Sequence, residues 1–111
     1  MAKDLTMSLL LDFYGDILPE RQREAMDLFY NGDLSLSEIA ETTGLTRQGV
    51  RDRIVKGEKT VSELEDKLGL AGRFGDVKKT VRFIVGRLEE IQKETGVPLG
   101  DVIEAVRKLE G

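Results

Sequence analysis

Three side chains near the middle of the chain could read the edges of nucleic-acid bases. They are Arg47, Gln48 and Arg51. In the major groove of duplex DNA, arginine can make two hydrogen bonds to guanine and glutamine can make two to adenine. On an α-helix, residues three and four positions apart are neighbours, so Arg51 would lie beside the other two. We predict that all three contact bases; the alternative is a solvated polar face that contacts another protein.

Four nearby residues could hold the phosphate backbone: Thr46, Arg53, Lys56 and Lys59. Hydroxyl and basic side chains make most contacts of this kind. Residues 46–60 carry five basic and two acidic side chains, a net charge of +3, whereas the whole chain carries −4. A basic ridge on an acidic chain can still meet phosphates. The alternative for the basic residues is ordinary surface charge.

The sequence contains no arrangement suited to catalysis. Its 111 residues include no cysteine and no histidine, which removes the thiolate and the usual general base and metal ligand. The carboxylates are spread along the chain without a nucleophile beside them. We therefore expect no enzymatic activity, no cofactor and no metal. The lack of cysteine suits the cytoplasm, and the apolar run at residues 7–11 is too short for a signal peptide or a membrane span.

The candidate contact residues fall in a helix-turn-helix pattern from Ser35 to about Lys59. Ser35 and Glu38 have the spacing of a capping box, which begins a short helix. Gly44 can adopt the positive φ of a turn, and Thr46 can cap the next helix, predicted over residues 47–68. In DNA-binding proteins of this class the second helix enters the major groove.

The rest of the chain also indicates helices, and no segment alternates like a strand. We predict one helix over 4–14, with Leu5, Leu9 and Phe13 on one face. A second is predicted to have Pro19 as its first helical residue and to end at Asn31 and Gly32, which both tolerate the left-handed conformation of a helix end. Two more are predicted over 76–95 and 99–109. Three glycines, at 69, 72 and 75, indicate a flexible connector, although Gly69–Gly72 formally matches the loop of an RNA-binding KH module. We place a boundary near residue 70, between a helix-turn-helix domain (1–70) and a C-terminal helical extension (71–111).

The helix predicted over 47–68 carries an apolar stripe beyond the part that could meet DNA. Its members recur at steps close to those of a coiled coil: Val50, Ile54, Val61, Leu64 and Leu68. The matching stripe of residues 74–91 favours packing of the two helices within one chain. The alternatives are packing of the stripe against the helix predicted over 4–14, and a homodimer formed by the long apolar helices.

Two stretches resemble known families. Leu18–Ala25 and Leu36–Ala40 are similar to the fourth region of bacterial sigma factors, which recognises a promoter element through a helix-turn-helix. A closer resemblance, over about Leu5 to Leu70, is to the small YlxM-type family of DNA-binding proteins. It rests on residues 11–14, 18–22, 36–41, 46–48 and 66–68. The resemblance implies an all-α, sigma-like helix-turn-helix bundle with a long recognition helix. It also implies a link to the signal recognition particle pathway.

Two functions follow as expectations. The first is a DNA-binding regulatory protein that places the helix of residues 47–68 in a groove. The second is an accessory factor that contacts the RNA, the targeting GTPase or the receptor of the signal recognition particle and does not bind DNA specifically. The basic ridge favours the first and the acidic balance favours the second.

Overall fold

The computed structural model describes residues 5–111, which are helical throughout apart from short turns. The described elements are α1 (Leu5–Tyr14), a 3-10 turn (Gly15–Ile17), α2 (Glu20–Tyr30), α3 (Leu36–Thr43), α4 (Arg47–Leu68), α5 (Leu70–Thr95), α6 (Gly100–Arg107) and a final 3-10 turn (Lys108–Glu110). The prediction of an all-α fold is confirmed. The chain divides into two compact units, residues 1–71 and 72–111.

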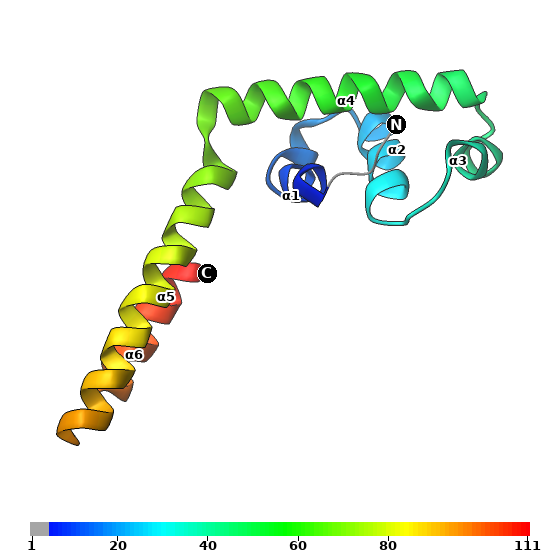
Figure 1. Cartoon of the computed structure of the whole chain (residues 1–111). Coiled ribbons are helices and arrows are strands. Elements are labelled where there is room, and N and C mark those ends of the chain that lie inside the picture. The colour runs from blue at the N-terminus through cyan, green and yellow to red at the C-terminus, as the bar shows by residue number, and fades with distance from the viewer. Residues whose placement is uncertain (1–4) are drawn as a thin grey trace. The chain divides into compact units, whose positions relative to one another are not determined.

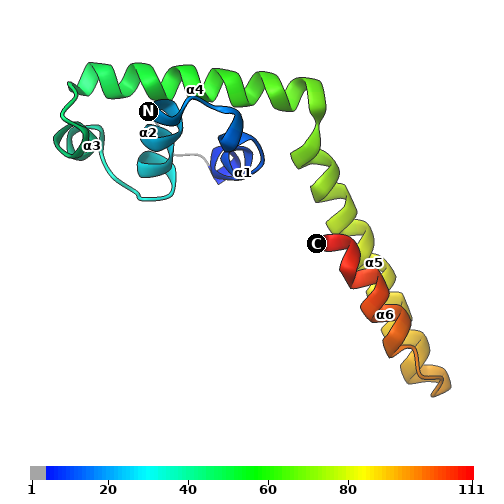
Figure 2. The ribbon, with the colours of Figure 1, turned by 180° about the vertical axis from the view of Figure 1, so that it is seen from behind.

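In the first unit, α4 is the longest helix, and α1, α2 and α3 pack along one side of it (Figures 1 and 2). Side chains from all four helices form one buried cluster. It comprises Leu10, Leu11, Tyr14, Leu18, Ala25, Met26, Phe29, Ile39, Val50, Ile54, Val61 and Ala71. Because the apolar sides of the short helices converge on α4, they fix its orientation and leave its other side in solvent.

The apolar stripe of α4 is buried by these three helices. Val50, Ile54 and Val61 are completely covered, whereas Leu68 at the end of the stripe is 45% exposed. The expectation that the stripe packs against the helix of residues 76–95 is therefore wrong for its buried members. The periods of the two stripes match, but α1, α2 and α3 already cover the one on α4.

In α1, Leu10, Leu11 and Tyr14 are buried, Phe13 packs partly buried against the core and Leu9 is 40% exposed; the side chain of Leu5 lies outside the described residues. Two local predictions for α2 need correction. Pro19 is the N-cap of α2 and not its first helical residue. After α2 the left-handed conformation falls on Asp33, with φ 55°, and not on the Asn–Gly pair before it.

The crossing of α2 and α4 depends on a glycine. Gly57 is buried in α4, and a Cβ atom added there would collide with Sδ of Met26 and lie 3.2 Å from its Cγ. Met26 is itself fully buried, so its side chain has little space into which it could move. The missing side chain thus allows the two helices to approach closely.

We expect Gly57→Ala to lower the free energy of unfolding by about 1–2 kcal/mol, because the overpacking cost exceeds the gain in helix propensity. Gly86→Ala is the matched control, since a Cβ at this position in α5 meets nothing within 4 Å. It should stabilise by about 0.5–1 kcal/mol. Urea unfolding followed by circular dichroism measures both, and a stabilised Gly57→Ala would contradict the close crossing.

The connection from α4 to α5 is a single residue, not the flexible connector that the glycines suggested. Gly69 ends α4 in the left-handed conformation, with φ 63°, and α5 begins at Leu70 and continues through Gly72 and Gly75. The Tyr14 hydroxyl donates to Oε1 of Glu65 (2.6 Å) and accepts from Leu70 N–H (3.1 Å). Oε1 of Glu65 also accepts from Ala71 N–H (3.0 Å). These side chains satisfy donors that a helix start leaves without partners, so α5 begins six residues before the predicted Asp76.

Tyr14 is completely buried at this junction. Burial and the hydrogen bond to Glu65 both raise the pKa of its phenol, since each disfavours the phenolate. The protonated phenol is therefore the form that fits the folded chain.

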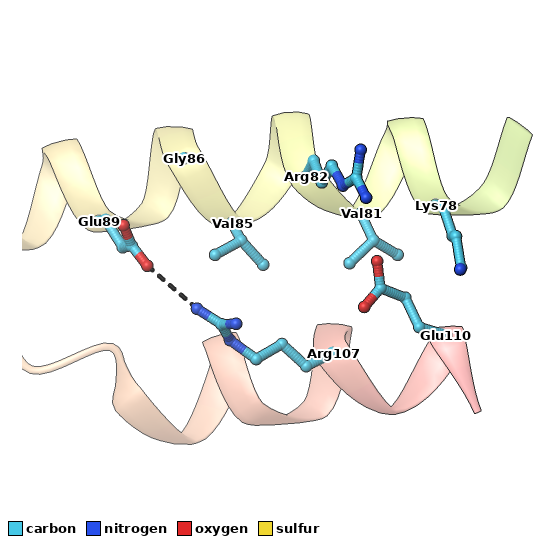
Figure 3. A pocket seen from close by; sticks show the side chains of 8 residues that line it. All are labelled: Lys78, Val81, Arg82, Val85, Gly86, Glu89, Arg107 and Glu110. Carbon is cyan, nitrogen blue, oxygen red and sulfur yellow. Dashed lines mark hydrogen bonds and ion pairs between the residues drawn. The ribbon is translucent and has the colours of Figure 1, made fainter. Parts of the chain in front are cut away.

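The second unit is a hairpin of two antiparallel helices, α5 and α6 (Figures 1 and 2). Gln92 Oε1 accepts from Leu99 N–H (2.7 Å) where the chain reverses. Closer to the C-terminus, Arg107 of α6 forms an ion pair with Glu89 of α5 at 3.2 Å, beside Val81 and Val85 (Figure 3). These two valines are the buried hydrophobic side chains of residues 72–111. The hairpin therefore has almost no core of its own.

Candidate nucleic-acid interface

The helix-turn-helix consists of α3, a short turn and α4. The predicted capping box is present: Glu38 N–H donates to Oγ of Ser35, Ser35 N–H donates to Oε1 of Glu38, and both distances are 3.1 Å. Gly44 ends α3 with φ 76°, and Thr46 caps α4 by accepting from Gly49 N–H at 3.0 Å. The buried Ile39 and Val50 hold α3 and α4 together in the core. Each local signal in the sequence therefore forms the contact that it predicts.

The three predicted base-contact residues lie together on the surface. Arg47, Gln48 and Arg51 are all exposed and, with Leu36 of α3, they line one shallow hollow. The hollow opens beside the first turns of α4, opposite the side that the core holds. The structure thus gathers two guanidinium groups and one amide on an accessible helix start. Leu36 was absent from the sequence prediction, which considered the polar residues of α4 alone.

Gln48 is not free in this surface. Its Nε2 donates to Oδ1 of Asp52 at 2.9 Å, one helical turn away. Glutamine recognises adenine through two hydrogen bonds, one from the amide N–H and one to the amide oxygen. Gln48 would therefore have to break its hydrogen bond to Asp52 before it could contact adenine in this way. The spacing of four residues between them was a signal in the sequence for this pair.

The four predicted phosphate-contact residues are distributed around α4. Thr46 is exposed, but its hydroxyl oxygen already accepts the capping hydrogen bond. Lys56 and Lys59 are exposed and Arg53 is half-buried. Lys59 follows Gln48 by three helical turns, about 16 Å along the axis, and so returns to the same side. Arg53 lies two residues after Arg51. Residues two apart on a helix do not face each other, so Arg53 projects from a different side of α4.

A second surface of the first unit is acidic. Exposed carboxylates of α1, the 3-10 turn and α2 surround Arg23, which pairs with Asp16 at 3.3 Å. They line two neighbouring hollows and comprise Asp12, Asp16, Glu20, Glu24 and Asp27. Phosphates would be repelled from this surface, so the start of α4 is the face of the unit that suits nucleic acid.

Comparison with known proteins places this arrangement in a family. A profile described as "Putative helix-turn-helix protein, YlxM / p13 like" matches residues 1–97. The chain belongs to this family, UPF0122. The resemblance to the YlxM-type family that the sequence suggested is thereby confirmed.

Curated relatives cover nearly the whole chain. The UPF0122 protein of Acetivibrio thermocellus is 43% identical over 91 residues, 82% of this chain and 78% of the relative. That of Bacillus mycoides is 37% identical over 110 residues, 99% of each chain. That of Desulforamulus reducens is 37% identical over 105 residues, 95% of this chain and 85% of the relative.

Within residues 5–111, no group of three or more acidic side chains gathers in a way that could hold a metal ion. No described helix combines the length and the apolar character needed to cross a membrane.

We expect Asp52→Ala to strengthen binding of duplex DNA about two- to ten-fold at low salt, since it frees Gln48 and removes a negative charge beside the hollow. Asp66→Ala, an exposed carboxylate near the other end of α4, is the control and should change the affinity little. Fluorescence anisotropy with labelled duplex measures both. Weaker binding by Asp52→Ala would show that Asp52 orients Gln48 for contact instead.

Proposed function

We propose that this protein is a non-enzymatic regulatory protein that binds duplex DNA through α4. Arg47, Gln48 and Arg51 would contact base edges. Backbone phosphates would be held by Thr46, Arg53, Lys56 and Lys59. The observation that carries the proposal is the hollow in which the three predicted base-contact side chains meet at an exposed helix start.

The packing of α4 explains how the contact would form. A helix enters the major groove only if one side is free of neighbours. In the first unit, α1, α2 and α3 cover one side of α4 and leave the side of Arg47 and Arg51 exposed. The buried side keeps the helix rigid, so the two arginines are held four residues apart on one face before DNA arrives.

A second candidate is an accessory role in the signal recognition particle pathway. The acidic surface around Arg23 supports it, because such a surface suits a basic protein partner better than a phosphate backbone. Here the helix-turn-helix would contact the particle's RNA, its GTPase or the receptor and would bind DNA without sequence preference.

Titration of labelled duplex DNA and of signal recognition particle RNA across about 50–200 mM salt distinguishes the two. If Arg53, Lys56 and Lys59 all contact phosphates, the log–log slope for the duplex should be near −2.7, about −0.9 for each. Lys56→Ala should make it shallower by about 0.9, while Lys93→Ala, an exposed lysine of α5, should not change it. Tight binding of the RNA with weak binding of every duplex would favour the second candidate. Binding of neither would refute both nucleic-acid roles.

A further inference from the structure

The α5–α6 hairpin leaves large apolar side chains on one of its sides. On α5, Val77, Ile84 and Ile91 recur at intervals of seven residues and so follow one line along the helix. Val102 of α6 and Leu109 of the final 3-10 turn are also exposed apolar side chains of the hairpin. Val77 is 39% exposed, Ile91 36%, Val102 42% and Leu109 64%. Leu109 lines one hollow together with Val77, Val81 and Ile84, so apolar side chains of α5 and of the C-terminal turn meet there. The name apolar face is used here for Val77, Ile84, Ile91, Val102 and Leu109.

The opposite side of the hairpin is polar. There, Val81 and Val85 lie beneath charged side chains that line another hollow: Lys78, Arg82, Glu89, Arg107 and Glu110 (Figure 3). The ion pair of Glu89 with Arg107 crosses this side. The hairpin therefore has one side suited to water and one side suited to a protein surface.

The hairpin buries little apolar surface by itself. Residues 72–111 form a unit of a size at which a domain that folds alone usually needs disulfides, a metal or association. The chain has no cysteine, and residues 5–111 contain no cluster of acidic side chains that could hold a metal ion. Association with another protein surface would supply the missing burial.

We propose that the apolar face is covered by the same face of a second copy, which gives a two-fold symmetric four-helix bundle. Such a pairing brings the two α5 helices together antiparallel, centred on Ile84. Val77 then lies opposite Ile91 of the second copy. A self-complementary surface is what two-fold symmetry requires, and the two hairpins together supply the enclosed core that four-helix bundles have.

The charges beside the apolar line match this antiparallel pairing. Arg73, Thr80, Arg87 and Glu94 flank the line at intervals of seven residues. Antiparallel pairing centred on Ile84 places Arg73 near Glu94 of the second copy, twice by symmetry, and Arg87 near Thr80. The Arg73–Glu94 contact therefore brings opposite charges together across the pairing.

The oligomeric state of the full chain tests the proposal without nucleic acid, so its outcome is independent of the proposed DNA binding. Sedimentation equilibrium should show a mass twice the 12.4 kDa of one chain. Leu109→Glu should raise the dimer dissociation constant by about thirty-fold or more, because the dimer would bury two unpaired carboxylates. Ile17→Glu is the control: Ile17 is 61% exposed and lies in the 3-10 turn of the first unit, outside the hairpin. A monomer at concentrations up to about 100 µM, or equal dissociation by both variants, would overturn the proposal.

The register has its own test. Arg73→Glu and Glu94→Arg should each weaken the dimer about three- to ten-fold, and the double variant should recover most of the loss. Circular dichroism confirms that each variant keeps its helices. Dimers that resist Leu109→Glu, or charge variants whose effects simply add, would contradict the antiparallel arrangement.

Discussion

Replacing both Arg47 and Arg51 by alanine is expected to weaken binding of the preferred duplex by about thirty-fold or more. Each arginine that bonds a guanine in two-point fashion contributes about 1–3 kcal/mol of discrimination. Both side chains are exposed and line the hollow at the start of α4, so their loss should not disturb the core. Anisotropy titrations with the selected duplex and with random duplex measure the affinity and the specificity.

A matched variant separates base contact from loss of charge. Arg21→Ala with Lys67→Ala also removes two exposed positive charges from the first unit, but neither residue lines the hollow. We expect it to change the affinity only slightly and to leave the sequence preference intact. If the two double variants bind DNA equally well, α4 does not read bases through its first turns.

Replacing Tyr14 by phenylalanine is expected to lower the melting temperature by roughly 5–15 °C, because buried partners lose their hydrogen bonds. The change removes the donor to Glu65 and the acceptor for Leu70 N–H at the junction of α4 and α5. The ring itself still fills the core. Tyr30→Phe is the control, since its hydroxyl also donates to a carboxylate, Glu58 at 2.6 Å, but Tyr30 is less buried. Equal effects of the two substitutions would contradict a special role for the junction.

Tyr14 also leads us to expect that the free energy of unfolding depends on pH in the alkaline range. The pKa of Tyr14 is raised in the folded chain above the ordinary value of 10.0. In the alkaline range the unfolded chain therefore releases this proton first, and stability falls as pH rises above 10.0. Below that pH the contribution of the phenol is fully present. Urea unfolding of the wild type and of Tyr14→Phe should show the difference between them shrink with rising pH; a constant difference would contradict the raised pKa.

Local signals in the sequence predicted the helix-turn-helix correctly. The capping box of Ser35 and Glu38, the positive φ of Gly44 and the cap at Thr46 each depend on residues within four positions of one another. Contacts of this kind depend on the residues at the ends of a helix and not on tertiary packing. For the same reason the bounds of α4, residues 47–68, agree with the prediction.

Predictions that needed knowledge of distant residues were less accurate. Residues 7–14 are apolar at so many positions that more than one face of α1 could have turned inward, and α2 and α4 selected Leu10, Leu11 and Tyr14. Similarly, Gly72 and Gly75 suggested a flexible connector. Tyr14, more than fifty residues away, and Glu65 provide the acceptors that let α5 begin at Leu70.

The candidate site, too, was predicted from the sequence only in its local features. The residue types at 47, 48 and 51 and their helical spacing indicated a common face, but only the fold added Leu36 of α3 to the hollow. The spacing of Gln48 and Asp52 allowed a pair, and the structure shows the hydrogen bond between them.

By itself, the sequence determined that the chain is helical, where α3 and α4 begin, and which polar residues share the exposed start of α4. Caps, turn glycines and apolar spacing act over a single helical turn, so they can be read in order along the chain. The tertiary structure decided which helices bury the stripe of α4 and which apolar side chains the hairpin leaves exposed. Those outcomes depend on competition among apolar surfaces far apart in sequence, and only packing resolves it.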